Sequence, residues 1–210
     1  MPRKTIVNIN EIDGCQLTDK PLPFNIKYLT KGIEILDDMS RRHSKVMQTR
    51  LDFRYPADSC SDGSNKVFSR AFQSLMQELK KEGCDPQYIA RREQNSSENP
   101  HCHVCIMVNG NVKQSQQSII KTAERHWGNA LGLTQQEVHE RQLVYPCNTD
   151  RHGNPRPNGY RLVRGAETNA ATRQDMIRQL SYLSKAKLED TTHSSTRKFF
   201  TSQTRKKKEE

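Results

Sequence analysis

Two histidines at the start of a short apolar run constrain this chain more than any other feature. His101 and His103 lead into residues 104–108, and Asn109-Gly110 closes the run. A short apolar run that ends in a turn dipeptide predicts a buried strand. Side chains two residues apart on a strand point to the same face, and their Cα atoms lie about 7 Å apart. The two imidazoles are therefore expected to face the same way, close enough to share one cation.

A carboxylate is available to complete such a site. Glu93 lies eight residues before His101, where a neighbouring antiparallel strand would bring it back beside the histidine pair. Two histidines and one carboxylate form a ligand set suited to a divalent metal with open coordination positions. Glu98 is nearer in sequence and is the competing carboxylate, but it lies in the loop before Asn99-Pro100. A lone H-x-H pair is most often a pair of surface or core histidines, so the interpretation depends on other features.

The cysteines give no sign of a disulfide framework or of structural zinc. Six are present, at positions 15, 60, 84, 102, 105 and 147, without disulfide-framework spacing. Cys102 and Cys105 have the spacing of a zinc half-site, but on a strand they point to opposite faces, and no second pair would complete four ligands. We therefore expect free thiols in a reducing cytoplasm.

Charge favours a nucleic acid as the partner. The 210 residues suit a single domain, hydrophobic residues make up 32%, and mean hydropathy is −0.94. The formal net charge is +10, and from Arg151 onward 14 Lys/Arg face 6 Asp/Glu. This balance indicates a polyanionic partner, nucleic acid before membrane. No run approaches a membrane span and no apolar stretch follows the start as a leader would, so a cytoplasmic location is expected.

Periodicity predicts an α+β domain with a mainly antiparallel sheet covered by helices. Residues 1–23 are expected to be an arm, residues 24–190 the folded domain, and residues 191–210 a basic, disordered tail. Within the domain, helices are expected over 28–43, 66–82, 113–131 and 172–187, and strands over 45–55, 86–94, 101–108, 142–146 and 160–163. Trp127 is expected to anchor the core.

Tyr182 stands out on the last expected helix. Met176, Leu180 and Leu183 form its apolar stripe, with Ile177 at the edge. Tyr182 falls off that stripe, on the side of Arg178 and Lys185. An ordinary surface tyrosine is the simplest interpretation for an isolated helix. A phenol flanked by cations also has a chemical use, because the cations favour phenolate and bind phosphate.

Three motifs together resemble a known superfamily. R-E-Q-N-S-S-E-N-P-H-C-H-V, S-Y-L-S-K and R-L-D-F-R-Y-P resemble motifs of the HUH endonucleases, which initiate rolling-circle replication. From about residue 26 to 188 the chain is similar to the filamentous-phage (inovirus) replication protein family, also found in bacterial prophages. The histidines precede the tyrosine, as in replication initiators. The resemblance implies a ferredoxin/RRM-like HUH fold and a bacterial host.

The resemblance also implies a chemistry. It is a metal-dependent, site-specific nick in single-stranded DNA at a replication origin, with Mg²⁺ or Mn²⁺ held by His101, His103 and Glu93. Tyr182 would attack phosphorus to give a 5′-phosphotyrosine and a free 3′-OH, and Lys185 would steady the charge. Four further cations are expected to bind the DNA: Arg54, Arg92, Arg178 and Lys187.

Several alternatives stay open. Position 186 is Ala, so only Tyr182 fits the motif, and a second protomer might supply a second cut. Tyr160 is the rival of Tyr182 as the nucleophile. The chain could be a single-tyrosine transposase, or a DNA-binding replication or repressor module without catalysis. A zinc-structured RNA-binding domain is the weakest idea. The sequence lacks G-x-x-x-x-G-K-[ST], so a host helicase and polymerase would be needed.

Overall fold

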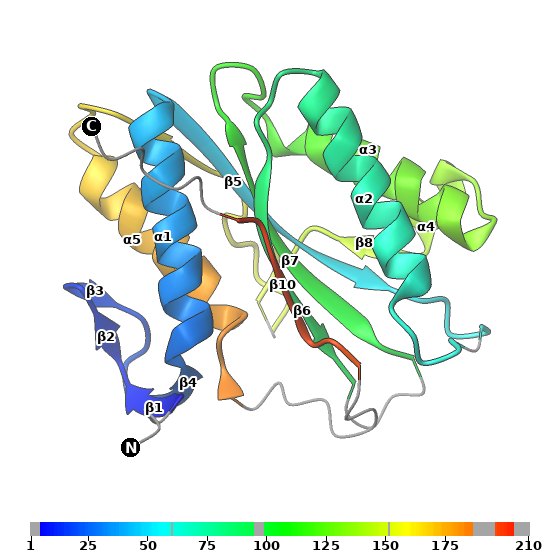
Figure 1. The fold of residues 1–210 in the computed structure, drawn as a ribbon, viewed down its shortest axis with the longest axis horizontal. Coiled ribbons are helices and arrows are strands. Elements are labelled where there is room, and N and C mark those ends of the chain that lie inside the picture. The colour runs from blue at the N-terminus through cyan, green and yellow to red at the C-terminus, as the bar shows by residue number, and fades with distance from the viewer. Residues whose placement is uncertain (1–4, 60, 95–98, 151, 187–195, 204–210) are drawn as a thin grey trace.

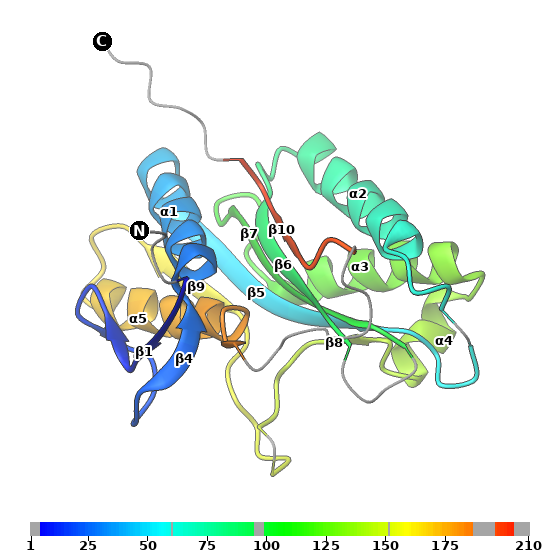
Figure 2. The same ribbon diagram turned by 60° about the horizontal axis from the view of Figure 1, so that its bottom comes forward.

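A central antiparallel sheet carries two layers of helices, one on each face. The computed structural model describes residues 5–59, 61–94, 99–150, 152–186 and 196–203. Helices α1 and α5 lie on one side of the sheet, and α2, α3 and α4 lie on the other (Figures 1 and 2). The expected α+β class with a mainly antiparallel sheet is confirmed. The helices are α1 (Ile26–Arg42), α2 (Lys66–Lys81), α3 (Gln116–Leu131), α4 (Gln135–Glu140) and α5 (Asn169–Tyr182).

The sheet is built around the long strand β5. Its order is β10-β6-β7-β5, and both β8 and β9 pair with the outer edge of β5. All of these pairings are antiparallel. The strands are β5 (Lys45–Arg54), β6 (Gln87–Glu93), β7 (His101–Asn109), β8 (Val144–Tyr145), β9 (Tyr160–Val163) and β10 (Phe199–Thr201). Because β5 and β7 are covered on both faces, nearly all of their residues are buried.

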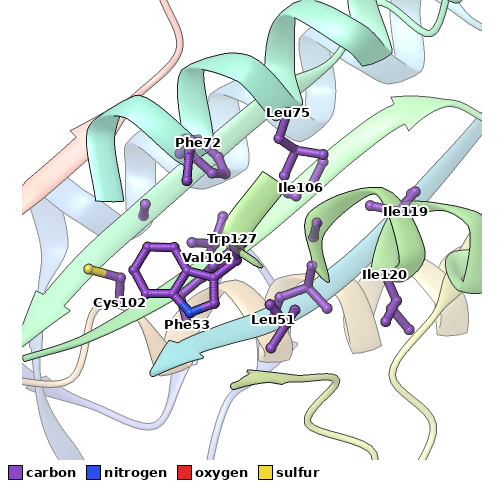
Figure 3. Packing of buried hydrophobic residues seen from close by; sticks show 14 of the residues in the cluster. Leu51, Phe53, Phe72, Leu75, Cys102, Val104, Ile106, Ile119, Ile120 and Trp127 are labelled. Atoms are coloured by element: carbon purple, nitrogen blue, oxygen red, sulfur yellow. The ribbon is translucent and has the colours of Figure 1, made fainter. Parts of the chain in front are cut away.

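The face of the sheet under α2 and α3 forms the larger core. Alternation on the strands sends Phe53, Cys102 and Val104 to this side, where they pack with the apolar stripes of the two helices (Figure 3). Trp127 is the expected core anchor: it is fully buried, and its indole N–H donates to the Arg54 carbonyl at 2.8 Å. The ring of Phe53 meets Trp127 edge-on, with centroids 5.6 Å apart.

The opposite face forms a second core beneath α1 and α5. Here Ile89, Cys105 and Met107 pack against the buried residues of the two helices. Cys102 and Cys105 thus lie on opposite sides of the sheet, as their spacing predicts. The five cysteines that lie in described residues are free thiols.

Residues before α1 are more structured than expected. Two small hairpins precede this helix, formed by β1 (Ile6–Ile9) with β4 (Leu22–Asn25) and by β2 (Glu11–Ile12) with β3 (Cys15–Gln16). Cys15 and Leu17 are 8% and 4% exposed and belong to the second core. The prediction of an arm outside the core is therefore wrong for these residues. Their apolar surface is buried in the core that also contains the buried residues of α5.

The expected disordered tail is wrong at one point. Phe199–Thr201 forms β10, which pairs with β6 in the register Phe199–Arg91. Phe199 stacks on Tyr28 of α1 with ring centroids 3.9 Å apart, and Phe200 packs beside Phe68 of α2. The two rings therefore pack on opposite faces of the sheet edge, Phe199 against α1 and Phe200 against α2, and these contacts stabilise the short strand. The basic run at 205–208 lies outside the described residues.

Two further differences concern helices. The last helix spans 169–182, not 172–187, so Tyr182 is its final residue. The six-residue helix α4 was not predicted, although Thr134 and Glu137 form a capping box at its start. In the part of the chain that the structure describes, no helix has both the length and the apolar character needed to cross a membrane.

Candidate active site

The three predicted metal ligands meet on the face of the sheet beneath α1 and α5. Glu93 on β6 pairs directly with His101 on β7, as the antiparallel prediction requires. His103 pairs with Asp52 on the other neighbour, β5. Residues directly opposite each other in an antiparallel pair point to the same face, so all four side chains share one side of the sheet. Glu98, the rival carboxylate, lies outside the described residues.

His103 is held between two carboxylates. Its Nδ1 lies 2.7 Å from Asp52 Oδ1, and its Nε2 lies 2.7 Å from Glu93 Oε2. The ring is only 5% exposed. Burial by itself would lower the pKa of His103, but the charge of Asp52 and the hydrogen bonds to Asp52 and Glu93 raise the pKa overall. Since ionised carboxylates only accept hydrogen bonds, the arrangement suits a ring that donates from both nitrogens.

Asp52 also carries a buried ion pair. Its carboxylate accepts from Arg50 Nη2 at 3.1 and 3.2 Å, and the two residues are 6% and 4% exposed. Burial would raise the pKa of Asp52, but the charges of Arg50 and His103 bring the pKa well below its usual value. Asp52 is thus an ionised group that links a buried guanidinium to the histidine.

His101 has a different environment from His103. Its side chain is half-buried. Burial, followed by the charges of His103 and Arg54, lowers the pKa of His101. A lowered pKa keeps an imidazole neutral at pH 7, and the neutral ring is the form that ligates metal.

The metal-ligand prediction concerns His101, His103 and Glu93. Their nitrogen and oxygen donors suit a divalent cation, and they occupy neighbouring cross-strand positions on one face. In the described part of the chain, no three His, Cys, Asp or Glu side chains already form a set that could hold an ion. Here the Nε2 of His103 and the Glu93 carboxylate bind each other. The donor chemistry therefore fits, and binding would require this hydrogen bond to open.

Tyr182 lies against this cluster. Its ring meets His103 edge-on, with centroids 5.4 Å apart, and the Arg50 guanidinium lies 3.5 Å above the ring centroid. A cation this close to an aromatic face is attracted by the ring. Tyr182 is half-buried and packs against the second core, so the interpretation of an ordinary surface tyrosine is wrong. Tyr160, its rival, is also half-buried, and its hydroxyl donates to the Pro157 carbonyl at 3.3 Å.

Lys185 follows Tyr182 beyond the end of the helix. Its Nζ lies 4.9 Å from the Tyr182 ring centroid. Burial, then the positive charges of Arg50 and Arg156, lower the pKa of Lys185. Lys185 also forms an antiparallel bridge with Phe24 of β4, which fixes the backbone of this segment.

Arg91 ties the end of α5 to the sheet. Its Nη1 donates to the carbonyls of Leu183 and Lys185, at 3.1 and 2.8 Å. These carbonyls follow the last turn of the helix, where backbone acceptors lack intrahelical donors. Arg91 on β6 therefore holds the segment that carries Tyr182 against the strand that carries Glu93.

The four cations expected to bind DNA fall in different places. Arg54 lies opposite His101 at the edge of the site, with its guanidinium 4.6 Å from the Tyr145 ring centroid. Arg178 is exposed on α5 beside Tyr182 and Lys185. Arg92 points to the other face, is fully buried, and donates to Asn65 and Gln94. It therefore offers no surface to DNA. Lys187 lies outside the described residues.

Arg50, Asp52 and Arg91 are the site residues that sequence reasoning missed. All three are charged yet no more than 6% exposed. Charged residues in a strand pattern are normally assigned to the solvent face. The available signal was the strict alternation of Arg50, Asp52 and Arg54 on β5, which places all three on the histidine face.

Comparisons with known proteins identify the family and little else. No curated protein matches. A solved structure, the N-terminal nuclease domain of non-structural protein 1 from minute virus of mice, covers 70% of this chain and 98% of its own, at 11% identity and a TM-score of 0.31. That likeness is too weak to carry an argument. The comparisons do not confirm the resemblance to the filamentous-phage family, which stays a hypothesis. The model of one family matches residues 14–202, nearly the whole chain: this protein belongs to the YagK/YfjJ C-terminal domain family.

Proposed function

We propose that this chain nicks and rejoins single-stranded DNA through Tyr182, and so initiates rolling-circle replication of a phage or other mobile element. One observation carries the proposal: a tyrosine ring packs 5.4 Å from a histidine that shares its sheet face with a second histidine and a glutamate. These groups come from α5, β7 and β6 and match two roles that a tyrosine nickase needs, a nucleophile and a metal site. Lys185, beyond the end of α5, fits the third role, a cation beside the developing charge.

The reaction exchanges one phosphoester bond for another. The phenolic oxygen of Tyr182 attacks phosphorus, the bond from phosphorus to the 3′ oxygen breaks, and the tyrosine proton is replaced by the 5′-phosphate of the DNA. The leaving 3′ oxygen takes up a proton and becomes the free 3′-OH. Rejoining is the reverse reaction, in which a 3′-OH attacks the phosphotyrosine. The covalent link retains the energy of the phosphodiester bond, so rejoining the DNA needs no nucleoside triphosphate as an energy source.

The residues of the chain prepare Tyr182 for this attack. Arg50 and Lys185 lie within 5 Å of the ring centroid and place positive charge where negative charge develops during the attack. Arg91 fixes the end of α5 through two backbone carbonyls, which limits the movement of the nucleophile. A divalent cation, Mg²⁺ or Mn²⁺, held by His101, His103 and Glu93 would polarise the scissile phosphate as a Lewis acid.

The partners follow from this proposal. Arg54 and Arg178 lie beside the site and bind the backbone of single-stranded DNA at the origin, and a host helicase and polymerase use the free 3′-OH. Ala186 occupies the position where a second motif tyrosine would stand. One chain therefore provides one motif nucleophile, and a second protomer supplies the second cut.

The test is covalent attachment to DNA. The full chain is incubated with a labelled pool of single-stranded oligonucleotides and Mn²⁺, then separated under denaturing conditions. We expect a covalent protein–DNA band from the unaltered protein and from Tyr160→Phe, and none from Tyr182→Phe, which loses one oxygen. Thermal unfolding of the two variants shows whether each has kept its fold.

Two results would contradict the proposal. If the unaltered protein shifts the DNA in a native gel but leaves no covalent band, the chain is a binding module. If Tyr182→Phe is still attached through a tyrosine, the nucleophile is another residue, with Tyr160 first to be examined.

A further inference from the structure

A cavity of about 260 Å³ opens beside Tyr182 on the side of α5. The phenol ring forms part of its wall together with the loop before β9 and residues Leu17 and Thr18. Pockets for drug-sized ligands begin at roughly 300 Å³. This cavity therefore has the size for a phosphate and the sugar next to it.

The lining of the cavity is strongly positive. Its lining includes four cationic side chains and one carboxylate, that of Asp175. The four cations are Arg50, Arg156, Arg178 and Lys185. Asp175 is engaged by Arg178 Nη1 at 2.9 Å. Positive charge concentrated in a concave site with low-dielectric walls attracts anions.

Arg50 gives independent evidence that this wall can bind a hydrogen-bond acceptor. It is 96% buried, yet within the described residues its Nε has no hydrogen-bond partner. The Asp52 carboxylate accepts hydrogen bonds only from the Nη2 of this guanidinium. A buried donor without a partner costs about 1–3 kcal/mol, so an unpaired Nε–H on a residue that lines this cavity favours the binding of an acceptor group there.

Arg156 completes the other side of the cavity. It lies on the loop before β9, is exposed, and is fixed by a hydrogen bond from Nε to the Cys147 carbonyl at 2.8 Å. Among the residues that the structure describes, the two terminal nitrogens of Arg156 make no side-chain hydrogen bond, and a guanidinium fork matches the geometry of phosphate oxygens. Burial first, and then the positive charges of Arg50 and Arg156, lower the pKa of Lys185, which lines the same cavity.

We propose that this cavity binds a non-scissile backbone phosphate of single-stranded DNA, held by Arg156, Arg178 and Lys185 above the buried Arg50. The place of this phosphate next to the scissile bond rests on the proposed nicking function. The phosphate fixes the register of the DNA relative to the phenol, because Tyr182 lines the same cavity. Such a contact positions the strand and carries no base information.

The binding test uses a fragment with no bond to cut. The full chain, labelled with ¹⁵N on arginine and kept in chelator, is titrated with thymidine 3′,5′-bisphosphate, with inorganic phosphate, and with chloride at equal ionic strength. We expect the Nε–H resonances of Arg50 and Arg156 to shift with the bisphosphate, which binds at least about tenfold more tightly than inorganic phosphate. Losing one charge-assisted hydrogen bond in Arg156→Gln should weaken the bisphosphate about 10–100-fold.

Arg70→Gln is the matched control. Arg70 is exposed and also makes one hydrogen bond to a backbone carbonyl, that of Ala130, but it lies on α2 across the sheet. Its loss should leave the affinity unchanged. Equal affinity in Arg156→Gln and Arg70→Gln, or inorganic phosphate binding as tightly as the bisphosphate, would overturn the inference.

The covalent-band assay separates this inference from the proposed function. A covalent band without bisphosphate binding at Arg156 would overturn the inference and leave the nicking function in place. Bisphosphate binding that depends on Arg156, without any covalent band, would support the phosphate site and contradict the nicking function.

Discussion

Replacing Asp52 by asparagine isolates the buried charge beneath Tyr182. Asp52 accepts from Arg50 at 3.1 and 3.2 Å and contacts His103 at 2.7 Å. Asparagine has nearly the same shape, so packing is preserved while the negative charge is removed. The Arg50 guanidinium would then remain buried at 4% exposure without its counter-charge.

The expected cost is large for a single substitution. Removing one partner of a buried ion pair costs about 3–5 kcal/mol, mostly because the other charge stays desolvated. For a chain of this size, each kcal/mol lowers the melting temperature by about 2–4 °C, so Asp52→Asn should melt roughly 6–20 °C lower. The free energy of unfolding of a domain is about 5–15 kcal/mol, so the variant should stay folded at low temperature.

The assay is urea unfolding of a double-mutant cycle. Asp52→Asn is measured in the unaltered chain and again in an Arg50→Met background, where no buried guanidinium is left without a partner. We expect the cost of Asp52→Asn to be at least about 2 kcal/mol smaller in the Arg50→Met background.

A matched surface pair provides the control. Asp37 and Arg173 form an ion pair at 2.8 Å, but their side chains are 40% and 33% exposed. Asp37→Asn should therefore cost no more than about 1 kcal/mol. A cost of Asp52→Asn below about 1 kcal/mol, or an equal cost in both backgrounds, would refute the argument from burial.

The remaining predictions concern activity. Chelation should abolish the covalent band while most DNA binding persists, and Glu93→Gln should reduce the band, whereas Glu98→Gln should not; full activity in Glu93→Gln would remove Glu93 from the metal site. Because burial and the charges of Arg50 and Arg156 lower the pKa of Lys185 below 10.5, the lysine loses its charge at a lower pH than a free lysine does. Adduct formation should therefore decline on the alkaline side before pH 10.5, and Lys185→Arg should remove that decline; identical profiles would show that this charge plays no part.

The sequence predicted the centre of the site because local periodicity determines it. Alternation on a strand places His101 and His103 on one face whatever the rest of the fold does. A neighbouring strand that turns back in the antiparallel sense then brings Glu93 to the register position of His101, as observed. The apolar stripe of α5 was also predictable from the sequence, and its residues Met176, Leu180 and Leu183 are fully buried.

The charged support of the site could not be predicted in this way. Asp52 contacts His103 on another strand, and Arg91 donates to two backbone carbonyls beyond α5, so these contacts join segments far apart in the chain. No local pattern reveals such a partner, so each of these residues looks like a surface charge. The fully buried Arg92 was misplaced for the same reason, because its acceptors lie in the loop before α2 and at the end of β6.

Short segments were missed where tertiary contacts decide the structure. Strand β10 has three residues and is stabilised by pairing with β6 and by the stack of Phe199 on Tyr28. The hairpins before α1 are equally short, so propensity alone gives them little weight. Helix α4 differs, because the capping box between Thr134 and Glu137 is visible in the sequence and was overlooked.

The wide spacing of the site residues along the chain has a consequence for how the protein is made. Strands β5, β6 and β7 and helices α1 and α2 are all complete by Asn109, whereas α5 ends at Tyr182. At about 5–20 residues per second, a ribosome needs roughly 4–15 s to make the intervening segment. During this time Arg50, Asp52 and His103 stay hydrated on an open sheet face. When α5 docks, it must offset the dehydration of these charges as well as bury its own apolar stripe. We therefore expect α5 to fold after β5, β6 and β7 and to open before them, so that the nucleophile sits on a less stable element than the strands that carry the histidines and Glu93.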